Sequence, residues 1–352
     1  MTGEHSTAGD VGGASAGRLA NVKRWPNGWL QVKVPLPFAL KYVNAYVVPE
    51  PEGGYTLIDP GLNTPEAVAA WNEALEQEGI RDEEIVRIVL THQHPDHYGL
   101  AGLFQQRSGA PVWMTKPSHR YALRMWGEGR TLGAKLTEAF ERHGMPSELR
   151  EGIADNLESF VGNVSPQPEV TYMEAGQPFR FGGIDWTTLD APGHASGQIL
   201  FYDAASRTIV CGDQVMPDIT PNVSIVPDES DDPLAAFLDS LRQLGELDVA
   251  LAFPGHREPF EDFSGRCSEL IRHHERRLDK IAQLLQEQED RSATGFEMCE
   301  LLFSARLRTN MHNLRFAMAE TLAHLVCLEQ QGRIELVERD GRSAVYRAKE
   351  VK

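Results

Sequence analysis

The sequence predicts an α/β protein with two domains, a strand-rich domain over residues 21–261 and a winged-helix-like domain over residues 262–352. Three observations lead to this prediction. The chain has 352 residues, about twice the ~150 residues of an average domain. Short apolar runs alternate with turn signals as far as about residue 260, interrupted by a helical insert over about 117–165. After residue 262 the apolar spacing becomes helical and ends in a hairpin.

The composition is that of a water-soluble globular protein, with 41% hydrophobic and 24% charged residues. No run approaches the ~20 uninterrupted apolar residues of a membrane helix, so we expect no membrane association. Residues 1–20 are rich in Gly, Ala, Ser and Thr and lack the apolar core of a secretory signal. We therefore predict a disordered tail over residues 1–20 and a cytoplasmic location.

The charge balance disfavours nucleic acid as a partner. The chain carries 34 basic and 51 acidic residues, a net charge of −17, which repels polyphosphates at long range. The four cysteines are far apart and form no C-x-x-C pair, so we expect reduced, buried thiols rather than a redox motif or a zinc knuckle.

The first elements can be assigned from turn and cap signals. Val43–Val48 and Tyr55–Ile58 flank a Pro-Glu-Gly-Gly turn at 51–54, which predicts a hairpin. Thr64 is followed by proline and glutamate, which predicts the start of a helix, and Gly79 predicts its end.

The middle of the chain places the predicted insert between two sets of strands. Ile85–Leu90 is predicted as a buried strand, and Val112–Met114 as a short one. Helices are expected at Tyr121–Trp126, Leu132–His143 and Leu149–Phe160. Strands are expected again at Val170–Met173, Trp186–Leu189, Ile199–Tyr202, Thr208–Cys211 and Val249–Phe253.

The C-terminal region has the element order of a winged helix. A long helix is predicted over Arg266–Gln288, and the spacing of Thr294 and Glu297 predicts a capping box that starts a second. A third helix is expected at Asn313–Gln331. Two strands, Ile334–Glu338 and Ala344–Arg347, then flank Asp340-Gly341, a hairpin signal.

The strongest chemical signal is the cluster His92-x-His94-x-Asp96-His97, which directly follows the predicted strand Ile85–Leu90. By composition alone, such a pattern would occur about once in a thousand chains of this kind, so the risk of a chance match is low. Imidazoles and a carboxylate are ligands that zinc, iron and manganese accept.

Three more polar residues follow predicted strands, and each comes after a glycine or a Pro-Gly pair: His194, Asp213 and His256. A single histidine in such a place usually makes an ordinary hydrogen bond, and a single aspartate usually forms a turn. Together with the first cluster, however, the three favour a shared site at a sheet edge.

These residues resemble the five motifs of the metallo-β-lactamase superfamily, in order, over about residues 25–260. The resemblance implies a four-layer αβ/βα sandwich that holds two divalent metal ions per chain at the edge of its two sheets. It further implies that the first metal is held by His92, His94 and His194, and the second by Asp96, His97 and His256. In the same resemblance, Asp213 bridges both metals and Asp59 supports the ligands from behind.

The implied chemistry is hydrolysis by a hydroxide that bridges the two metals. Zinc is favoured as the metal, with iron and manganese as alternatives. Two such ions lower the pKa of a shared water and polarise the bond to be cleaved. Asp213 and Asp96 are the predicted catalytic residues, and Asp213 would orient the nucleophile and carry its proton to the leaving group.

The predicted substrate is a small ester, thioester or lactone, because Asp96 and Asp213 make the site more similar to glyoxalase II and lactonases than to many true β-lactamases. The alternative is a metal-dependent endoribonuclease, because the C-terminal element order resembles the branch of the β-lactamase-like mitochondrial ribonuclease. A DNA-binding regulator is disfavoured, since Arg315 is the one fixed positive charge of helix 313–331. An iron-dependent dioxygenase is left open. The C-terminal region is expected to form a lid edge or a homodimer interface.

Overall fold

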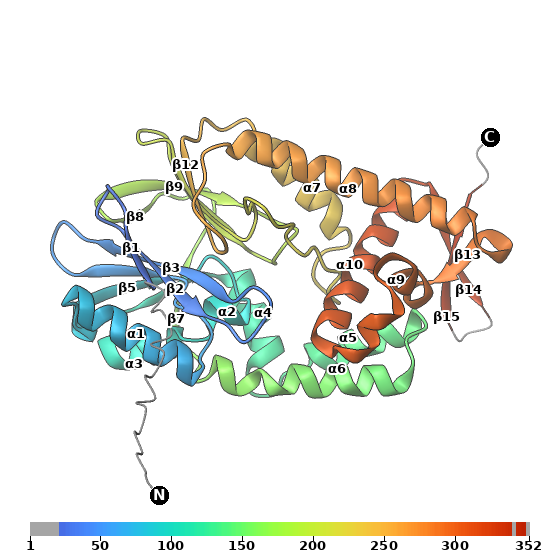
Figure 1. Cartoon of the computed structure of the whole chain (residues 1–352), viewed down its shortest axis with the longest axis horizontal. Helices are drawn as coiled ribbons and strands as arrows, with labels where there is room; N and C mark the ends of the chain where they lie inside the picture. Colours follow the sequence, from blue (N-terminus) through green and yellow to red (C-terminus); the bar gives the residue numbers. More distant parts are fainter. Residues whose placement is uncertain (1–20, 340–342, 350–352) are drawn as a thin grey trace, which may run out of the picture.

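The computed structural model describes residues 21–339 and 343–349. In the larger part of the chain, two β-sheets face each other (Figure 1). The predicted tail, residues 1–20, and the Asp340-Gly341 turn lie outside the described residues. The first sheet has the order β1 (Val22–Arg24), β2 (Leu30–Pro35), β3 (Tyr42–Pro49), β4 (Tyr55–Ile58), β5 (Ile85–Val89), β6 (Val112–Thr115) and β7 (Val170–Met173). The second has the order β12 (Leu251–Pro254), β11 (Thr208–Gly212), β10 (Ile199–Asp203), β9 (Ile184–Asp190) and β8 (Phe179–Phe181).

The side chains between the sheets form one apolar layer. Alternate residues of a strand point to opposite faces, so Ile199 and Phe201 of β10 face the other sheet, while Leu200 belongs to the core on the helical side. Trp29, just before β2, and Trp186 of β9 meet in this layer at a ring distance of 5.9 Å. The predicted αβ/βα sandwich is therefore confirmed.

Helices cover the outer faces of both sheets: α1 (Pro65–Glu78) and α3 (Ala101–Ser108) on the first, and α7 (Pro233–Leu244) and the start of α8 (Phe263–Gln286) on the second. The short helix α2 (Pro95–Tyr98) lies at the edge of the first sheet. The predicted caps of α1 are present. The Thr64 hydroxyl accepts a hydrogen bond from the amide of Ala67 at 3.1 Å, and Gly79 ends the helix with φ 67°.

The insert between β6 and β7 is helical, as the sequence predicts. It consists of α4 (Lys116–Trp126), α5 (Leu132–Arg142), α6 (Ser147–Ser159) and the short turn η2 (Val161–Val164). In Figure 1, α5 and α6 reach away from the sheets toward the C-terminal helices, and α6 contacts α10 (Met311–Gln330).

The C-terminal region contains α8, α9 (Gly295–Phe303) and α10, followed by β14 (Ile334–Arg339) and β15 (Ser343–Ala348). The capping box between Thr294 and Glu297 is present at the start of α9. The two strands pair antiparallel as predicted, and β13 (Ser292–Thr294) adds a third strand to their sheet, which the sequence analysis missed. The assignment as a winged helix and the boundary at residues 261 and 262 stay predictions.

Two further differences concern missing elements. The sequence analysis assigned no strands before Val43 and no helix between residues 214 and 248, where β1, β2 and α7 lie. The signal for α7 was present, since Asp232 caps it by accepting from the amide of Ala235 at 2.9 Å and Pro233 is its first residue.

The structure also bears on the predictions about the cysteines and about membrane helices. All four cysteines are buried and free, as expected: Cys211, Cys267, Cys299 and Cys327. Among the described residues, no helix is both long and apolar enough to span a bilayer. The cytoplasmic location and the homodimer stay predictions.

Candidate metal centre

The predicted site residues meet at one edge of the sandwich because neighbouring parallel strands end there. β4 and β5 run parallel, so Asp59 and the loop at 91–97 leave the first sheet side by side. β11 and β12 also run parallel, so Asp213 and His256 leave the second sheet at the same edge. His194 follows β9 in that sheet.

Two of the glycines before these residues are required, for different reasons. Gly193 has φ 114°, and a Cβ there would lie 2.3 Å from the Cβ of Phe237. Gly255 has no such backbone constraint, but its Cβ would lie 2.2 Å from Oδ1 of Asp213 and 2.5 Å from Cε1 of His97. A larger residue at 255 would therefore fill the space between two site residues.

The first group of converging side chains is His92, His94 and His194, whose ligand atoms all lie within 4.8 Å of one another. Nε2 of His92 and Nδ1 of His94 are 3.1 Å apart. Two nitrogens bound to one tetrahedral zinc at about 2.0–2.1 Å are separated by roughly 3.3 Å, so this spacing fits a shared cation.

The second group is Asp96, His97 and His256, which meet the same 4.8 Å limit. Nε2 of His256 is 3.2 Å from Oδ2 of Asp96. Asp213 lies between the two groups. Its Oδ1 is 3.4 Å from Nε2 of His97, and its Oδ2 is 3.4 Å from Nε2 of His256 and 3.7 Å from Nε2 of His194.

Several atoms that face this centre are buried and lack a hydrogen-bond partner: Nε2 of His97, Nε2 of His194, Nε2 of His256 and Oδ1 of Asp213. Unsatisfied buried polar atoms cost free energy and are rare in folded proteins. Four of them that converge on one small volume indicate that a cation completes their bonding. The residues present therefore fit a pair of divalent metal ions.

The opposite nitrogens of the rings are held by the protein. Nδ1 of His194 donates to the carbonyl of Asn222 at 2.8 Å, and Nδ1 of His256 donates to the carbonyl of Tyr42 at 2.9 Å. Each bond points Nε2 at the centre, where the neutral form of the ring presents a lone pair. Orientation of this kind is typical of histidines that bind metals.

Asp59 lies behind the ligands rather than among them. Its carboxylate accepts hydrogen bonds from the amide of Thr91 at 2.8 Å, the Thr91 hydroxyl at 2.7 Å and Nδ1 of His97 at 2.9 Å. Because the hydroxyl proton of Thr91 goes to Asp59, its oxygen accepts from Nδ1 of His92 at 2.9 Å. Asp59 is close enough to His92 and His97 to form a ligand group with them, but its oxygens are already engaged.

Burial and charge divide the histidines into two kinds. Burial, with His97 and His94 nearby, holds the pKa of His92 well below its ordinary value, and burial with His194 lowers the pKa of His94 to about 3. Both are thus neutral imidazoles. Burial also lowers the pKa of His256, but the Asp213 and Asp96 carboxylates outweigh it and raise this pKa to about 10.

The Asp59→Asn variant should lower metal affinity about 10- to 100-fold and destabilise the fold, because an asparagine cannot accept all three hydrogen bonds. Metal content after dialysis against a series of buffered zinc concentrations would measure the affinity. Asp203→Asn is the matched control, since Asp203 caps the turn at residues 203–206 after β10 and has no contact with the centre. Unchanged affinity in Asp59→Asn would show that Asp59 does not support the ligands.

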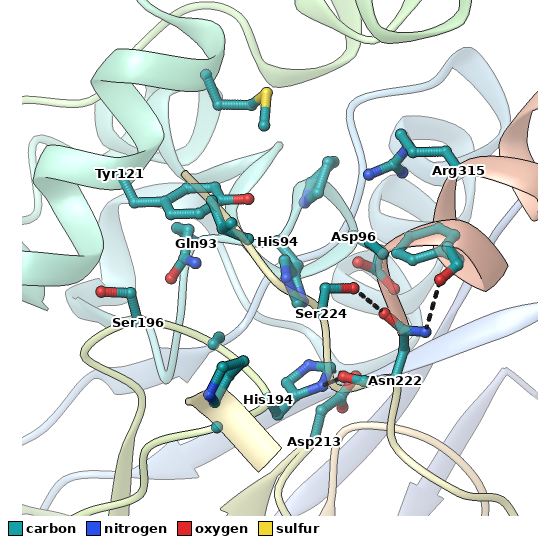
Figure 2. A pocket seen from close by; sticks show the side chains of 18 of the residues that line it. Gln93, His94, Asp96, Tyr121, His194, Ser196, Asp213, Asn222, Ser224 and Arg315 are labelled. Atoms are coloured by element: carbon teal, nitrogen blue, oxygen red, sulfur yellow. Dashed lines mark hydrogen bonds and ion pairs between the residues drawn. The ribbon is translucent and has the colours of Figure 1, made fainter. Parts of the chain in front are cut away.

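The centre lies at the bottom of a cavity of about 780 Å³ (Figure 2). Tyr121, Met125 and Trp126 of α4, in the helical insert, line it. Met216 and Asn222, on the loop after Asp213, also line it.

A third wall is formed by α10, in the C-terminal region expected to form a lid edge or a homodimer interface, although the sequence analysis identified none of its residues as lining a cavity. His312, Arg315 and Phe316 of this helix line the cavity. They lie far along the chain from the residues of α4 that form the first wall, and no local motif marks them. His274 of α8 lies outside the cavity lining. It packs against His324 of α10, with ring nitrogens 3.1 Å apart.

The loop at Asn222 joins the centre to the C-terminal region. The side-chain NH₂ of Asn222 donates to Oε2 of Glu320 on α10 at 3.0 Å. The main-chain carbonyl of Asn222 accepts the hydrogen bond from Nδ1 of His194. Glu320 also forms an ion pair with Arg277 of α8. Through these contacts, α10 and α8 hold the Asn222 loop, and this loop holds the predicted metal ligand His194 in place.

Comparisons with known proteins agree with this geometry. Residues 39–256 match the metallo-beta-lactamase superfamily, and residues 278–350 match the metallo-beta-lactamase-like C-terminal domain. The chain is 29% identical to a probable metallo-hydrolase, YqjP, of Bacillus subtilis over 86% of this chain and 92% of that protein. An atrochrysone carboxyl ACP thioesterase of Aspergillus fumigatus is 23% identical over 71% of this chain, which spans 46% of that protein.

A solved structure is similar over nearly the whole chain. The metallo-beta-lactamase family protein of Thermus thermophilus has a TM-score of 0.81 and 31% identity, covering 92% of this chain and 99% of that one. The chain is therefore a metallo-hydrolase that belongs to the metallo-beta-lactamase superfamily.

Proposed function

We propose that the chain is a dinuclear metal-dependent hydrolase of a small ester, thioester or lactone. The observation that carries this proposal is the convergence of the seven predicted ligands at the bottom of a cavity large enough for a small molecule. His92, His94 and His194 would hold one divalent ion, Asp96, His97 and His256 the other, with Asp213 between them. Zinc is the metal we favour.

The chemistry follows from this assignment. A pair of divalent cations lowers the pKa of a water molecule and withdraws charge from the carbonyl oxygen of the substrate. Asp213 is placed to accept the proton of the attacking water and to pass it to the leaving group, because its carboxylate lies between the two histidine groups. Its pKa is held well below the ordinary value by His256 and His97, against the opposing effect of burial, so it is ionised at neutral pH.

The cavity wall supports an acyl substrate. Apolar and aromatic side chains line the space beside the centre: Phe38, Leu40, Met125, Trp126, Phe160 and Ile225. Such a wall excludes water and binds the hydrocarbon part of an ester by burial of apolar surface. The relative from Aspergillus fumigatus is named as a thioesterase, which favours a thioester among the three.

The competing proposal, an endoribonuclease, is less well supported. The net charge of −17 repels a polyphosphate chain at long range. The C-terminal helix α10 also closes one side of the cavity, whereas a nucleic-acid strand needs an open groove that follows its backbone.

Elemental analysis and a substrate panel test the proposal. We expect close to two zinc ions per chain and measurable turnover of 4-nitrophenyl esters, S-acyl thioesters or lactones. Single-stranded RNA and bis-4-nitrophenyl phosphate serve as the competing substrates, assayed at two salt concentrations, since RNA binding weakens steeply with salt. Efficient, salt-sensitive RNA cleavage without acyl hydrolysis would overturn the proposal, as would an active sample free of metal.

A further inference from the structure

We propose that Arg315 forms an anion-binding subsite in the cavity, so that the substrate is an acyl compound with a carboxylate or a phosphate away from the bond that is cleaved. This inference rests on the proposed hydrolase function and deepens it, because it assigns a charge to the substrate. It arises from the C-terminal wall of the cavity, which is separate from the seven predicted ligands.

Arg315 is a cation that lines the cavity without an ion partner. Among residues 21–339 and 343–349, none forms an ion pair with its guanidinium or accepts a hydrogen bond from it, and its buried Nε lacks any partner. Its guanidinium lies 4.0 Å from the ring centre of Phe316. Burial lowers the pKa of Arg315 to about 10, so it remains a cation at neutral pH. Arg315 is half-buried, and an unpaired charge in such a place is costly, so function is a common reason for keeping one.

The other cationic side chains nearby are already neutralised. Arg120, which also lines the cavity, lies 3.4 Å from Glu229, and Arg124 forms a second ion pair with the same carboxylate. Glu229 accepts from the Ser196 hydroxyl at 2.7 Å as well. Glu229 is thus satisfied without Arg315. The guanidinium of Arg315 therefore remains available to a ligand.

Two neutral groups line the same cavity as Arg315 and can donate or accept hydrogen bonds. Figure 2 shows the hydroxyl of Tyr121 directed toward the cavity from the side opposite Arg315. Burial raises the pKa of Tyr121 to about 12, so its hydroxyl keeps its proton and can donate to an anion. His312 stacks on Phe38 at a ring distance of 4.8 Å, and its buried Nδ1 has no partner.

The subsite lies across the cavity from the centre. Figure 2 places His194 and Asp213 at the bottom of the view and Arg315 near its top, with Asp96 between them. An acyl compound could therefore place its scissile carbonyl at the metal centre and its anionic group against Arg315. The planar guanidinium binds carboxylates and phosphates through two parallel hydrogen bonds, which makes either group a suitable ligand.

Matched substrate pairs test this proposal and separate the two sources of charge. The first pair compares kcat/KM for mono-4-nitrophenyl glutarate with that for 4-nitrophenyl butyrate, and tests for recognition of a carboxylate on the acyl chain. S-butyryl-4′-phosphopantetheine against S-butyryl-pantetheine tests a phosphate on the leaving group. The full-length protein with its metals should prefer the charged member of one pair by about 10- to 100-fold in kcat/KM, the range expected for a charge-assisted hydrogen bond.

The variant Arg315→Met should bring that preference close to one, mainly through a higher KM for the charged member, and should change kcat/KM of the neutral member much less than that of the charged member. Arg315→Lys should keep part of the preference. Arg306→Met is the control, because Arg306 is exposed, precedes α10 and does not line the cavity. The midpoint of thermal unfolding of Arg315→Met should not fall, since the change removes an unpaired charge from a half-buried position.

A binding measurement keeps the test independent of turnover. Calorimetry compares glutaric acid monoanilide with butyranilide, and phosphopantetheine with pantetheine, on the wild type and Arg315→Met. Tighter binding of a charged member that is lost in Arg315→Met supports the subsite, even if no ester is hydrolysed and the hydrolase proposal fails. Equal binding within both pairs, or a preference that survives in Arg315→Met, overturns it.

Discussion

The variant Asp213→Asn should lower kcat about a thousandfold or more and leave the fold intact. The amide has the size of the carboxylate, but it cannot take up a proton from water and presents an NH₂ donor toward one of the histidines that surround it. Steady-state rates on an ester from the panel would measure the loss. Circular dichroism and the midpoint of thermal unfolding would show whether the variant folds.

The control for this variant is Asp239→Asn. Asp239 lies on α7, where it is exposed and paired with Arg242. This change removes the same charge from the protein without touching the centre, so full activity is expected. If Asp213→Asn kept most of its activity, Asp213 would not be the proton carrier.

Removal of the metals should abolish hydrolysis and destabilise the protein. Without cations, the buried nitrogens of His97, His194 and His256 have no bonding partner, and the carboxylates of Asp96 and Asp213 lie among them. A site saturated at about a thousand times its Kd contributes roughly 4 kcal/mol to the free energy of unfolding. We therefore expect dialysis against a chelator to lower the midpoint of thermal unfolding by several degrees.

Two comparisons make this result specific. Zinc added back to the dialysed protein should restore both activity and the unfolding midpoint. The double variant His97→Ala/His256→Ala should bind about one ion fewer per chain, because it removes two of the three residues assigned to the second ion. A chelated sample that is free of metal and still fully active would contradict the dinuclear assignment.

The local part of the site was predictable from the sequence because one turn carries most of it. His92, His94 and His97 follow a single buried strand, so their proximity needs no knowledge of the fold. His194, Asp213 and His256 required the further inference that strand ends meet at one sheet edge, and the structure brings them together there.

One of the missed strands, β2, has a physical explanation. Gln31 of β2 is polar yet completely buried, and its side-chain amide donates to the side-chain oxygen of Asn44 on β3 at 2.8 Å. Polar residues inside a sheet that is covered on both faces obscure the apolar pattern of a strand. The wall formed by α10 was unpredictable for another reason, since the position of Arg315 depends on how two distant parts of the chain pack.

The link from His194 through Asn222 to Glu320 has a thermodynamic consequence. A cation that immobilises His194 also restrains the Asn222 loop, and through it the docking of α10. By reciprocity, whatever tightens α10 against the sandwich raises the affinity of the centre for its ions. Slower hydrogen exchange in α10 should thus accompany metal loading, and an acyl anion that engages this helix would favour retention of the metals during turnover.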